Sequence, residues 1–193
     1  LAWTNTRGFR ADGSIGLRFA FHTAFYENQS VMPSWVDTVV RYTEVVPGQG
    51  YAKPFKGKGY DYAFAEGHLA WAPSKYFTLM FGQGRQFIGE GYRSLMLSDA
   101  AHNYPFLSVR TKVWHLEYVN LFTQMQHMEM PYAGVNRWKK KYTAMHYLSY
   151  NILPWLNVGL FEAIIFPAED DNGRLGFEIA YLNPVIFYRP VEY

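Results

Sequence analysis

Residues 14–27 alternate between apolar side chains and small or polar ones, and this alternation most constrains the fold. The apolar positions are Ile15, Leu17, Phe19, Phe21 and Phe25, and the even positions between them are Gly16, Arg18, Ala20, His22 and Ala24. A helix would spread these apolar residues around its circumference, whereas a strand places them on one face. A strand this long exceeds the common soluble strand and matches the roughly 9–11 residues of a tilted membrane strand. We therefore expect a membrane-spanning β-strand here, followed by a turn at residues 28–33.

Two further segments predict a β-hairpin, the repeating unit of an up-and-down barrel wall. Residues 60–71 and 76–84 also alternate, and an Ala-Pro-Ser-Lys turn lies between them. Residues 33–46 carry apolar side chains nearer a helical spacing, which predicts a short helix or a capping loop. Additional strands are expected at residues 106–126, 142–152, 155–166 and 175–188. In the 155–166 strand, Glu162 interrupts the apolar face and would have to lie near a rim or a register-shifting bulge.

These segments predict an all-β protein, a single antiparallel up-and-down transmembrane β-barrel domain over residues 1–193. The aromatic content of 19% favours strands, because flat rings pack well on pleated surfaces. A total of about eight strands fits a small closed barrel or a piece of a larger one, and we expect the latter. The sequence contains no run of about 18 apolar residues, which excludes a helical membrane protein. It opens at Leu1 without an export-signal pattern, so we expect any such signal to be removed or to lie upstream.

Tyrosine and tryptophan residues near the ends of the expected strands predict aromatic girdles at the two membrane interfaces. The alternative is that they are ordinary core aromatics. The residues concerned are Tyr26, Trp71, Tyr76, Tyr142, Tyr150 and Trp155.

Composition excludes several classes of function. The net charge of +2 provides no field that would gather nucleic acid. The absence of cysteine rules out disulfides, thiolate zinc sites and a cysteine nucleophile. The six histidines form no compact ligand set, and no Gly-x-Ser-x-Gly elbow occurs, so we expect neither a metal, a cofactor nor a serine hydrolase.

The richest polar stretch is residues 82–99, GQGRQFIGEGYRSLMLSD, which follows an expected strand. It lacks the spacing of phosphate-binding loops, and glycines next to strands more often mark bulges, bends or a close approach of two backbones. Its candidate glycan-binding residues are Arg85, Glu90, Tyr92, Arg93 and Asp99.

Charged residues on later strands are expected to face the lumen of the barrel, namely Arg110, Lys112, Glu117, Glu178 and Arg189. Buried charges must be paired, so one interpretation is a salt-bridge network that stabilises the wall. The other interpretation is a polar lining that binds a glycan or an anionic ligand. A glycosidase pair of Glu90 with Asp99 or Glu178 is a further hypothesis, but the spacing supports no particular separation.

The basic run 137–141, Arg-Trp-Lys-Lys-Lys, falls between two expected strands. Such a run is usually a solvated loop. At a membrane it could instead engage lipopolysaccharide phosphates or other anionic headgroups.

Three segments carry a resemblance to a known family. The first is FGQGRQFIGEGYRSLMLSDAAHNYPFLSVRTKVWHLEYVNLF, the second is VVPGQG at residues 45–50, and the third is the ending YLNPVIFYRPVEY. They resemble the RemB-type gliding motility proteins of Bacteroidetes, and more distantly the Wzi-type capsule assembly proteins. The resemblance covers roughly residues 45–193, and Arg85, Glu90, Tyr92, Arg93, Ser94 and Asp99 belong to the shared segment. Such proteins are much longer than this chain.

This resemblance implies an outer-membrane β-barrel associated with surface polysaccharide or gliding, and it implies no catalysis. We therefore expect a non-enzymatic protein of the bacterial outer membrane, involved in capsule attachment or gliding motility. Its expected partners are outer-membrane lipid, lipopolysaccharide, surface polysaccharide or other surface proteins. The alternative is a soluble or periplasmic β-rich enzyme that acts on glycans.

Overall fold

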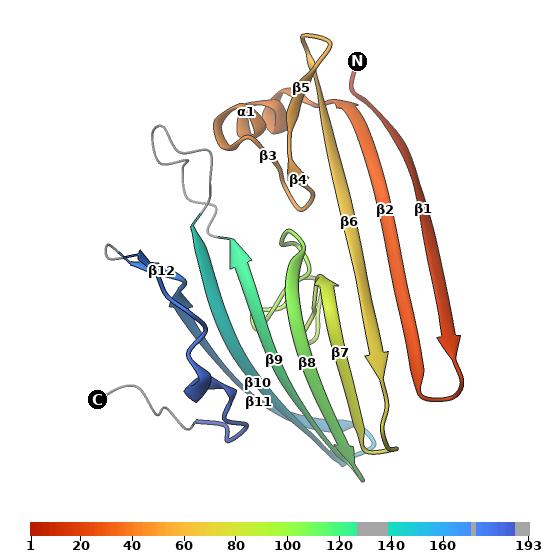
Figure 1. Ribbon diagram of the computed structural model, residues 1–193, viewed down its shortest axis with the longest axis vertical. Coiled ribbons are helices and arrows are strands. Elements are labelled where there is room, and N and C mark those ends of the chain that lie inside the picture. The colour runs from red at the N-terminus through yellow and green to blue at the C-terminus, as the bar shows by residue number, and fades with distance from the viewer. Residues whose placement is uncertain (127–138, 171–172, 188–193) are drawn as a thin grey trace.

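The computed structural model describes residues 1–126, 139–170 and 173–187. One antiparallel sheet dominates it, with the strand order β1-β2-β6-β7-β8-β9-β10-β11 and with short β5 paired to β6 (Figure 1). The long strands are β1 Trp3–Ile15, β2 Phe19–Val31, β6 Gly59–Trp71, β7 Phe77–Gly84, β8 Tyr104–Val113, β9 Leu116–Gln126, β10 Lys140–Leu153 and β11 Leu156–Pro167. The short elements are α1 Ser34–Thr43, β3 Val45–Val46, β4 Gly50–Tyr51, β5 Lys53–Phe55, β12 Glu169–Asp170, β13 Gly173–Arg174 and a 3-10 helix at Ile179–Leu182.

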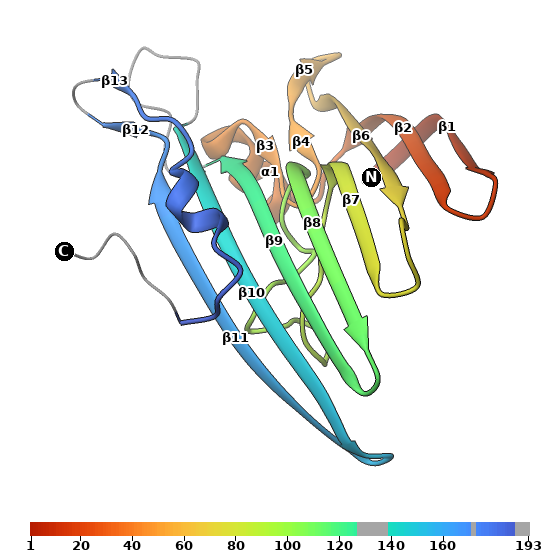
Figure 2. The ribbon, with the colours of Figure 1, turned by 60° about the horizontal axis from the view of Figure 1, so that its bottom comes forward.

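The prediction of an all-β protein is confirmed, and each long strand pairs with its successor among the long strands of the chain. Within the described residues β1 and β11 each have a single neighbour, so the sheet is open there. Short turns join the strands at one end, at residues 16–18, 72–76, 114–115 and 154–155. The long connections lie at the opposite end, where α1 and the β3–β4 hairpin are also found (Figures 1 and 2).

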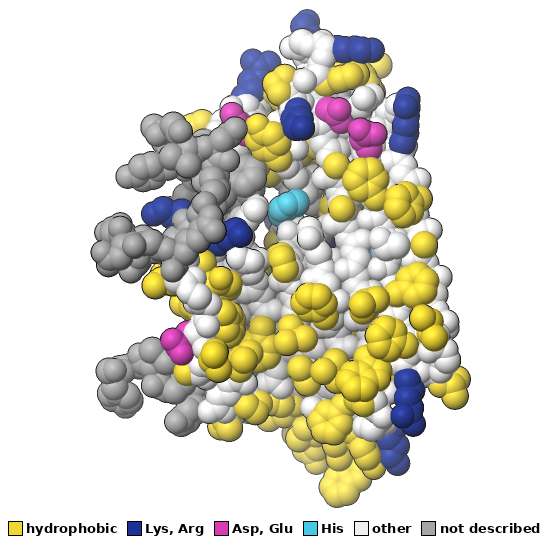
Figure 3. Space-filling model, in the orientation of Figure 1, with side chains coloured by type: hydrophobic (Ala, Val, Ile, Leu, Met, Phe, Trp, Pro, Cys, Tyr) yellow, Lys and Arg dark blue, Asp and Glu magenta, His cyan; other side chains and the backbone are white. Residues whose placement is uncertain are grey.

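The two faces of the sheet differ sharply in what covers them. Segment 85–103, which joins β7 to β8, lies on one face together with α1, and we call this the inner face (Figure 2). The outer face carries a cross-strand row of Phe21, Leu69 and Phe81, which are register partners in turn. These three side chains are 37%, 50% and 65% exposed. Figure 3 shows hydrophobic side chains spread over the middle and lower parts of the outer face.

Two packed clusters lie on the inner face. Ile88, Tyr104, Phe106, Leu121 and Met145 form the larger one, which joins segment 85–103 to strands β8, β9 and β10. Val40, Val46, Ala52 and Tyr62 form the second, which seats α1 and the β3–β4 hairpin against β6. Burial of these apolar groups is what fixes the long connections to the sheet.

Part of the outer face is covered as well. Residues 175–187 lie across strands β9 to β11, where Phe177 contacts the rings of Phe122 and Phe166. Beneath this segment His146 Nδ1 lies 2.7 Å from Asn120 Oδ1, and the backbone N–H of Phe187 donates to Glu162 Oε2 at 2.5 Å. Glu162 is therefore accommodated by a covering segment, and neither a rim position nor a bulge is needed.

Several strand boundaries differ from the sequence prediction. The single strand expected at 14–27 is two strands, because Gly16, at φ +63°, turns the chain between Ile15 and Phe19. The turn expected at 28–33 is wrong, since Asn28 and Ser30 continue β2 and bond to Thr6 and Thr4 of β1. Residues 106–126 are likewise two strands joined at Trp114 and His115.

The first strand, Trp3–Ile15, was missed, and the strand expected at 175–188 is wrong over its described part. The chain there follows the outer face and forms only the short 3-10 helix. Of the short helix or capping loop expected within 33–46, the structure shows the helix, and the 60–84 hairpin is confirmed.

Gly82 shows why a glycine stands in the middle of β7. A Cβ atom at this position would lie 2.2 Å from the backbone oxygen of Gly67 and 2.5 Å from the Cα of His68. Strands β6 and β7 therefore approach too closely for a side chain, as the glycine-rich sequence predicts.

Replacing Gly82 with alanine is expected to lower the free energy of unfolding by about 1–3 kcal/mol, because backbone must move to admit the methyl group. Gly84→Ala is the matched control, since its Cβ would meet the Phe106 ring at an ordinary 3.6 Å. Urea unfolding in the same detergent measures both variants. Equal midpoints for Gly82→Ala and Gly84→Ala would contradict the close approach.

Candidate functional site

Segment 85–103 organises the polar groups of the inner face. Ile88 anchors it in the larger cluster, and reciprocal backbone bonds between Ile88 and Leu97 close it into a loop. The Ser94 hydroxyl donates to the backbone oxygen of Ile88 inside this loop. Residues of this segment line two hollows, which we call the inner recess and the mouth pocket.

The inner recess, of about 370 Å³, is lined by charged and imidazole side chains from β1, β2, β6 and the start of segment 85–103. His22 Nδ1 lies 2.6 Å from Asp12 Oδ1, and His22 Nε2 lies 3.5 Å from Glu66 Oε1. Arg10 Nε donates to Asp12 at 2.7 Å, and the His22 and His68 rings lie 5.2 Å apart. These carboxylates have cationic or imidazole partners, as the wall-stabilising interpretation of lumenal charges requires.

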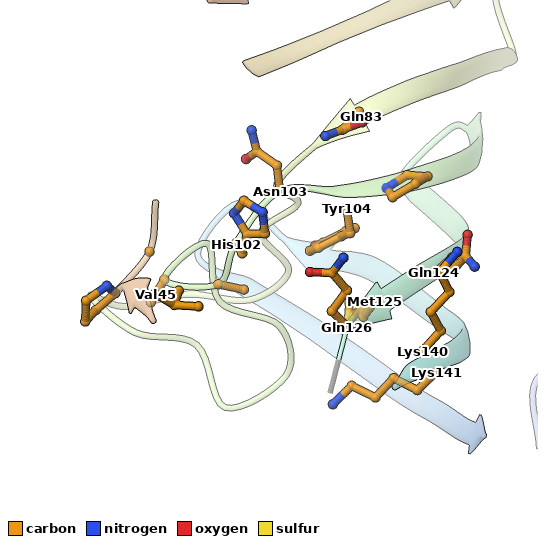
Figure 4. A pocket seen from close by; sticks show the side chains of 15 residues that line it. Val45, Gln83, His102, Asn103, Tyr104, Gln124, Met125, Gln126, Lys140 and Lys141 are labelled. Atoms are coloured by element: carbon orange, nitrogen blue, oxygen red, sulfur yellow. The ribbon is translucent and has the colours of Figure 1, made fainter. Parts of the chain in front are cut away.

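The mouth pocket, of about 550 Å³, lies where the long connections meet the ends of β9 and β10 (Figure 4). His102 and Asn103 reach it from the end of segment 85–103, Gln124 and Gln126 from β9, and Lys140 and Lys141 from β10. The remaining lining residues are Val45, Pro47, Gly48, Gln83, Ala100, Ala101, Tyr104, Pro105 and Met125. No aspartate or glutamate is among these described lining residues, so the pocket has an excess of positive charge.

Two buried polar atoms beside the pocket have no protein partner among the described residues. Asn103 is 7% exposed, and its amide nitrogen donates to the Ala65 oxygen at 2.6 Å. Its Oδ1 atom, like His102 Nδ1, is buried without a hydrogen-bond partner among the described residues. Burial, together with the nearby Arg85 charge, lowers the pKa of His102, so its imidazole is neutral at neutral pH. Lys140 and Lys141 are consecutive residues of β10, so their side chains point to opposite faces of the sheet and do not form one charged cluster.

The structure separates the five candidate glycan-binding residues. Arg85 lines the inner recess, where its guanidinium lies 4.9 Å from the Phe64 ring centroid and donates to the backbone oxygen of Asp99 at 3.2 Å. Glu90, Tyr92 and Arg93 are exposed on the loop, outside both hollows, with Arg93 stacked over Tyr92 at 5.7 Å. Glu90 and Asp99 do not meet across a described cavity, so the structure adds nothing to the hypothesis of a glycosidase pair.

Of the five residues expected to form a lumenal charge network, only Arg110 and Glu117 form an ion pair within the described residues. Arg110 Nε lies 3.2 Å from Glu117 Oε1, and Lys112 is exposed opposite Glu117 in the register. The strand placement of Glu178 is wrong, because this residue caps the 3-10 helix of the segment on the outer face and accepts from Ala180 N. Arg189 lies outside the described residues, as do Arg137 and Trp138 of the basic run.

Sequence reasoning missed most of the residues that line the two hollows. Asp12, His22, Glu66 and His68 come together through strand register, which no local pattern reveals. The even positions of residues 14–27 were a usable signal for His22, since they define the polar face of that strand. Gln124, Gln126 and Asn103 left no such signal.

The fold and the hollows define an all-β protein built on one antiparallel sheet, with packed connections on its inner face and exposed apolar side chains on the uncovered part of its outer face. No family model, curated protein or solved structure matches the chain. None of the described helices has the length and apolar character needed to cross a membrane. Within the described ranges, no group of three or more His, Cys, Asp or Glu residues is arranged to hold a metal ion.

Proposed function

We propose that this chain forms part of the wall of a bacterial outer-membrane β-barrel, and that the barrel holds surface polysaccharide and has no enzymatic activity. The observation that carries the proposal is the exposure of large apolar side chains along the outer face, opposite an inner face with buried polar groups. Soluble proteins rarely expose a contiguous apolar patch of this kind, whereas a lipid-facing wall requires one.

The dimensions of the apolar region support a membrane setting. Phe19, Phe21 and Phe25 share the outer face of β2, and Glu27 follows on the same face. Strands rise by about 3.3 Å per residue, so Phe19 to Phe25 spans about 20 Å. The apolar band of such barrels is about 25 Å tall. On β1 the polar boundary falls at Arg7, the register partner of Glu27.

The two ends of the sheet differ in the way typical of outer-membrane barrels, which have short periplasmic turns and longer loops at the cell surface. Exposed aromatic side chains lie near the short turns, as expected of an interfacial girdle, and include Trp71, Tyr76, Tyr150 and Trp155. Tyr26 and Tyr142 do not join them, because Tyr26 lies near Phe64 on the inner face and Tyr142 packs against Phe177.

The polysaccharide part of the proposal rests on the polar hollows and on the resemblance to RemB-type and Wzi-type proteins. The inner recess lies on the inner face, and the mouth pocket lies at the end of the sheet with the long connections. In a barrel of this orientation that end faces the cell exterior, where capsule, lipopolysaccharide and other surface proteins are encountered. A role in capsule attachment or in gliding is consistent with this placement.

Membrane fractionation of cells that produce the full-length protein tests the proposal. The protein is expected in the outer-membrane fraction, and it is expected to aggregate once detergent is removed. A protein that fractionates with periplasmic contents and stays monodisperse without detergent would overturn the proposal. That result would favour the soluble or periplasmic glycan-active enzyme instead.

A further inference from the structure

We infer that the short-turn end of the sheet inserts into the headgroup layer of a membrane leaflet and binds anionic phospholipid there. This inference rests on the proposed function and specifies the lipid partner of one end of the wall. The surface concerned comprises the four short turns at residues 16–18, 72–76, 114–115 and 154–155, which we call the turn rim.

The turn rim is one continuous surface. Its turns lie together at the lower end of the sheet (Figure 1), and backbone hydrogen bonds join neighbouring hairpins there. These bonds run from Ala72 N–H to Arg18 O at 2.8 Å, from Lys112 N–H to Tyr76 O at 2.8 Å, and from Asn151 N–H to His115 O at 2.9 Å. Side chains of all four turns can therefore meet the same partner.

Large apolar side chains project from three of the four turns. Leu17, Trp114 and Trp155 are 103%, 93% and 79% exposed. Turns that face water favour glycine, proline, asparagine, aspartate and serine instead. Trp114 also has a φ of +54°, a left-handed conformation that bulky residues rarely adopt. The turn geometry does not call for tryptophan at this position, whereas a membrane interface favours it.

The reach of the turns matches the thickness of a headgroup layer. Each such layer is about 5–8 Å thick, since a bilayer of about 40–45 Å contains a hydrocarbon core of about 30 Å. Leu17 lies two residues beyond the ends of β1 and β2, which corresponds to at most about 7 Å. Trp114 and Trp155 each directly adjoin a strand end. With Trp71 and Tyr76 at the edge of the hydrocarbon, the turn rim therefore lies among the headgroups.

The charge of the turn rim selects an anionic lipid. The rim contains Arg18 and Lys75 but no aspartate or glutamate. Both cations are exposed, and neither forms an ion pair within the described part of the chain. Lys75 Nζ lies 4.9 Å from the ring centroid of Tyr76, which holds the ammonium group beside an interfacial aromatic. Basic residues at this depth attract anionic headgroups, and a zwitterionic lipid supplies no net counter-charge.

Figure 3 is consistent with this combination of apolar and basic groups. It shows hydrophobic side chains down to the lower end of the molecule, with Lys and Arg side chains beside them.

A fluorescent label at Ser74 tests the inference in the full-length protein. Ser74 is exposed in the turn rim, and this part of the protein has no cysteine, so Ser74→Cys provides a labelling site. The protein is reconstituted into phosphatidylcholine vesicles with a trace of phosphatidylglycerol or phosphatidylcholine, each spin-labelled high on its acyl chain. Spin-labelled phosphatidylglycerol is expected to quench the label about fivefold more strongly, the effect of one basic residue at an anionic surface. Added salt is expected to reduce this difference.

Charge variants locate the lipid contact. Combining Arg18→Gln with Lys75→Gln is expected to make the two spin-labelled lipids quench the Ser74 label equally, because the rim then has no side chain with a fixed positive charge. Lys58→Gln is the matched control, since Lys58 is an exposed cation in the turn between β5 and β6, at the opposite end of the sheet. This control is expected to keep the full preference for phosphatidylglycerol.

A second label, at Phe81→Cys, separates this inference from the proposed function. Phe81 lies at mid-depth on the outer face, so lipid spin-labelled deep in its acyl chain quenches this label if the outer face meets lipid. Quenching at Phe81 with none at Ser74, or with equal quenching by the two lipids at Ser74, would overturn the anionic-lipid contact alone. A preference that survives the double variant would also overturn it. Absence of quenching at Phe81 would overturn the proposed function itself, and the inference with it.

Discussion

Phe81→Arg is expected to destabilise the protein in a lipid bilayer by about 2–4 kcal/mol, because it places a cation at mid-depth on a lipid-facing strand. Phe81 is 65% exposed on the outer face of β7, four residues from the start of that strand. In water, arginine at so exposed a position would change stability by only about ±0.5 kcal/mol. The size of the loss in the free energy of unfolding therefore distinguishes an outer face in contact with lipid from one in contact with water. Urea unfolding of the protein in lipid vesicles measures it.

Phe77→Arg is the matched control for this experiment. Phe77 lies on the same face of the same strand, is 45% exposed and borders the turn at residues 72–76. Near the interface the penalty of an arginine falls to about 0–1 kcal/mol. Equal effects of the two substitutions, or no effect of either, would contradict a bilayer around this face.

The alternation of strand residues could be predicted from sequence because it is a local pattern. A turn could be predicted only where it moves the outward-facing residues from odd to even positions. The three residues between Ile15 and Phe19 leave both partners at odd positions on one face, so the pattern runs through the turn unbroken. The two residues between Val113 and Leu116 shift the outward positions from odd to even. That shift was a usable signal within residues 106–126.

Periodicity also says nothing about which face of a strand is covered. Phe64 alternates as regularly as Phe21, yet Phe64 is 6% exposed and Phe21 is 37% exposed. The difference comes from α1 and segment 85–103, which lie on the inner face only. Their placement depends on packing between residues far apart in the sequence, such as the cluster that includes both Ile88 and Met145.

The candidate site was located only approximately from sequence for the same reason. The 82–99 stretch drew attention to Arg85, which does reach the inner recess. The mouth pocket, however, combines residues from β3, segment 85–103, β9 and β10. Its lining residues form no pattern in any one segment, and they become neighbours only when the strand ends and the long connections meet.

Leu121→Ala tests whether the inner-face core holds this site in place. Leu121 is 1% exposed, and it belongs to the same cluster as Ile88, near the start of segment 85–103, and Tyr104, directly after its end. Truncating a buried leucine costs about 2–5 kcal/mol, through lost transfer energy and the cavity that remains. We expect a loss of this size in the free energy of unfolding and faster proteolysis within segment 85–103.

Leu95→Ala provides the control, because Leu95 lies on segment 85–103 but is fully exposed. An exposed substitution of this kind is expected to change stability by at most about 0.5 kcal/mol. If Leu121→Ala lowered the free energy of unfolding while proteolysis of segment 85–103 stayed at the level of Leu95→Ala, the segment would be held independently of the cluster. The contact of Ile88 with the sheet would then be incidental, and the position of His102 and Asn103 would have to depend on the β3–β4 hairpin and on β6, where Asn103 bonds to Ala65.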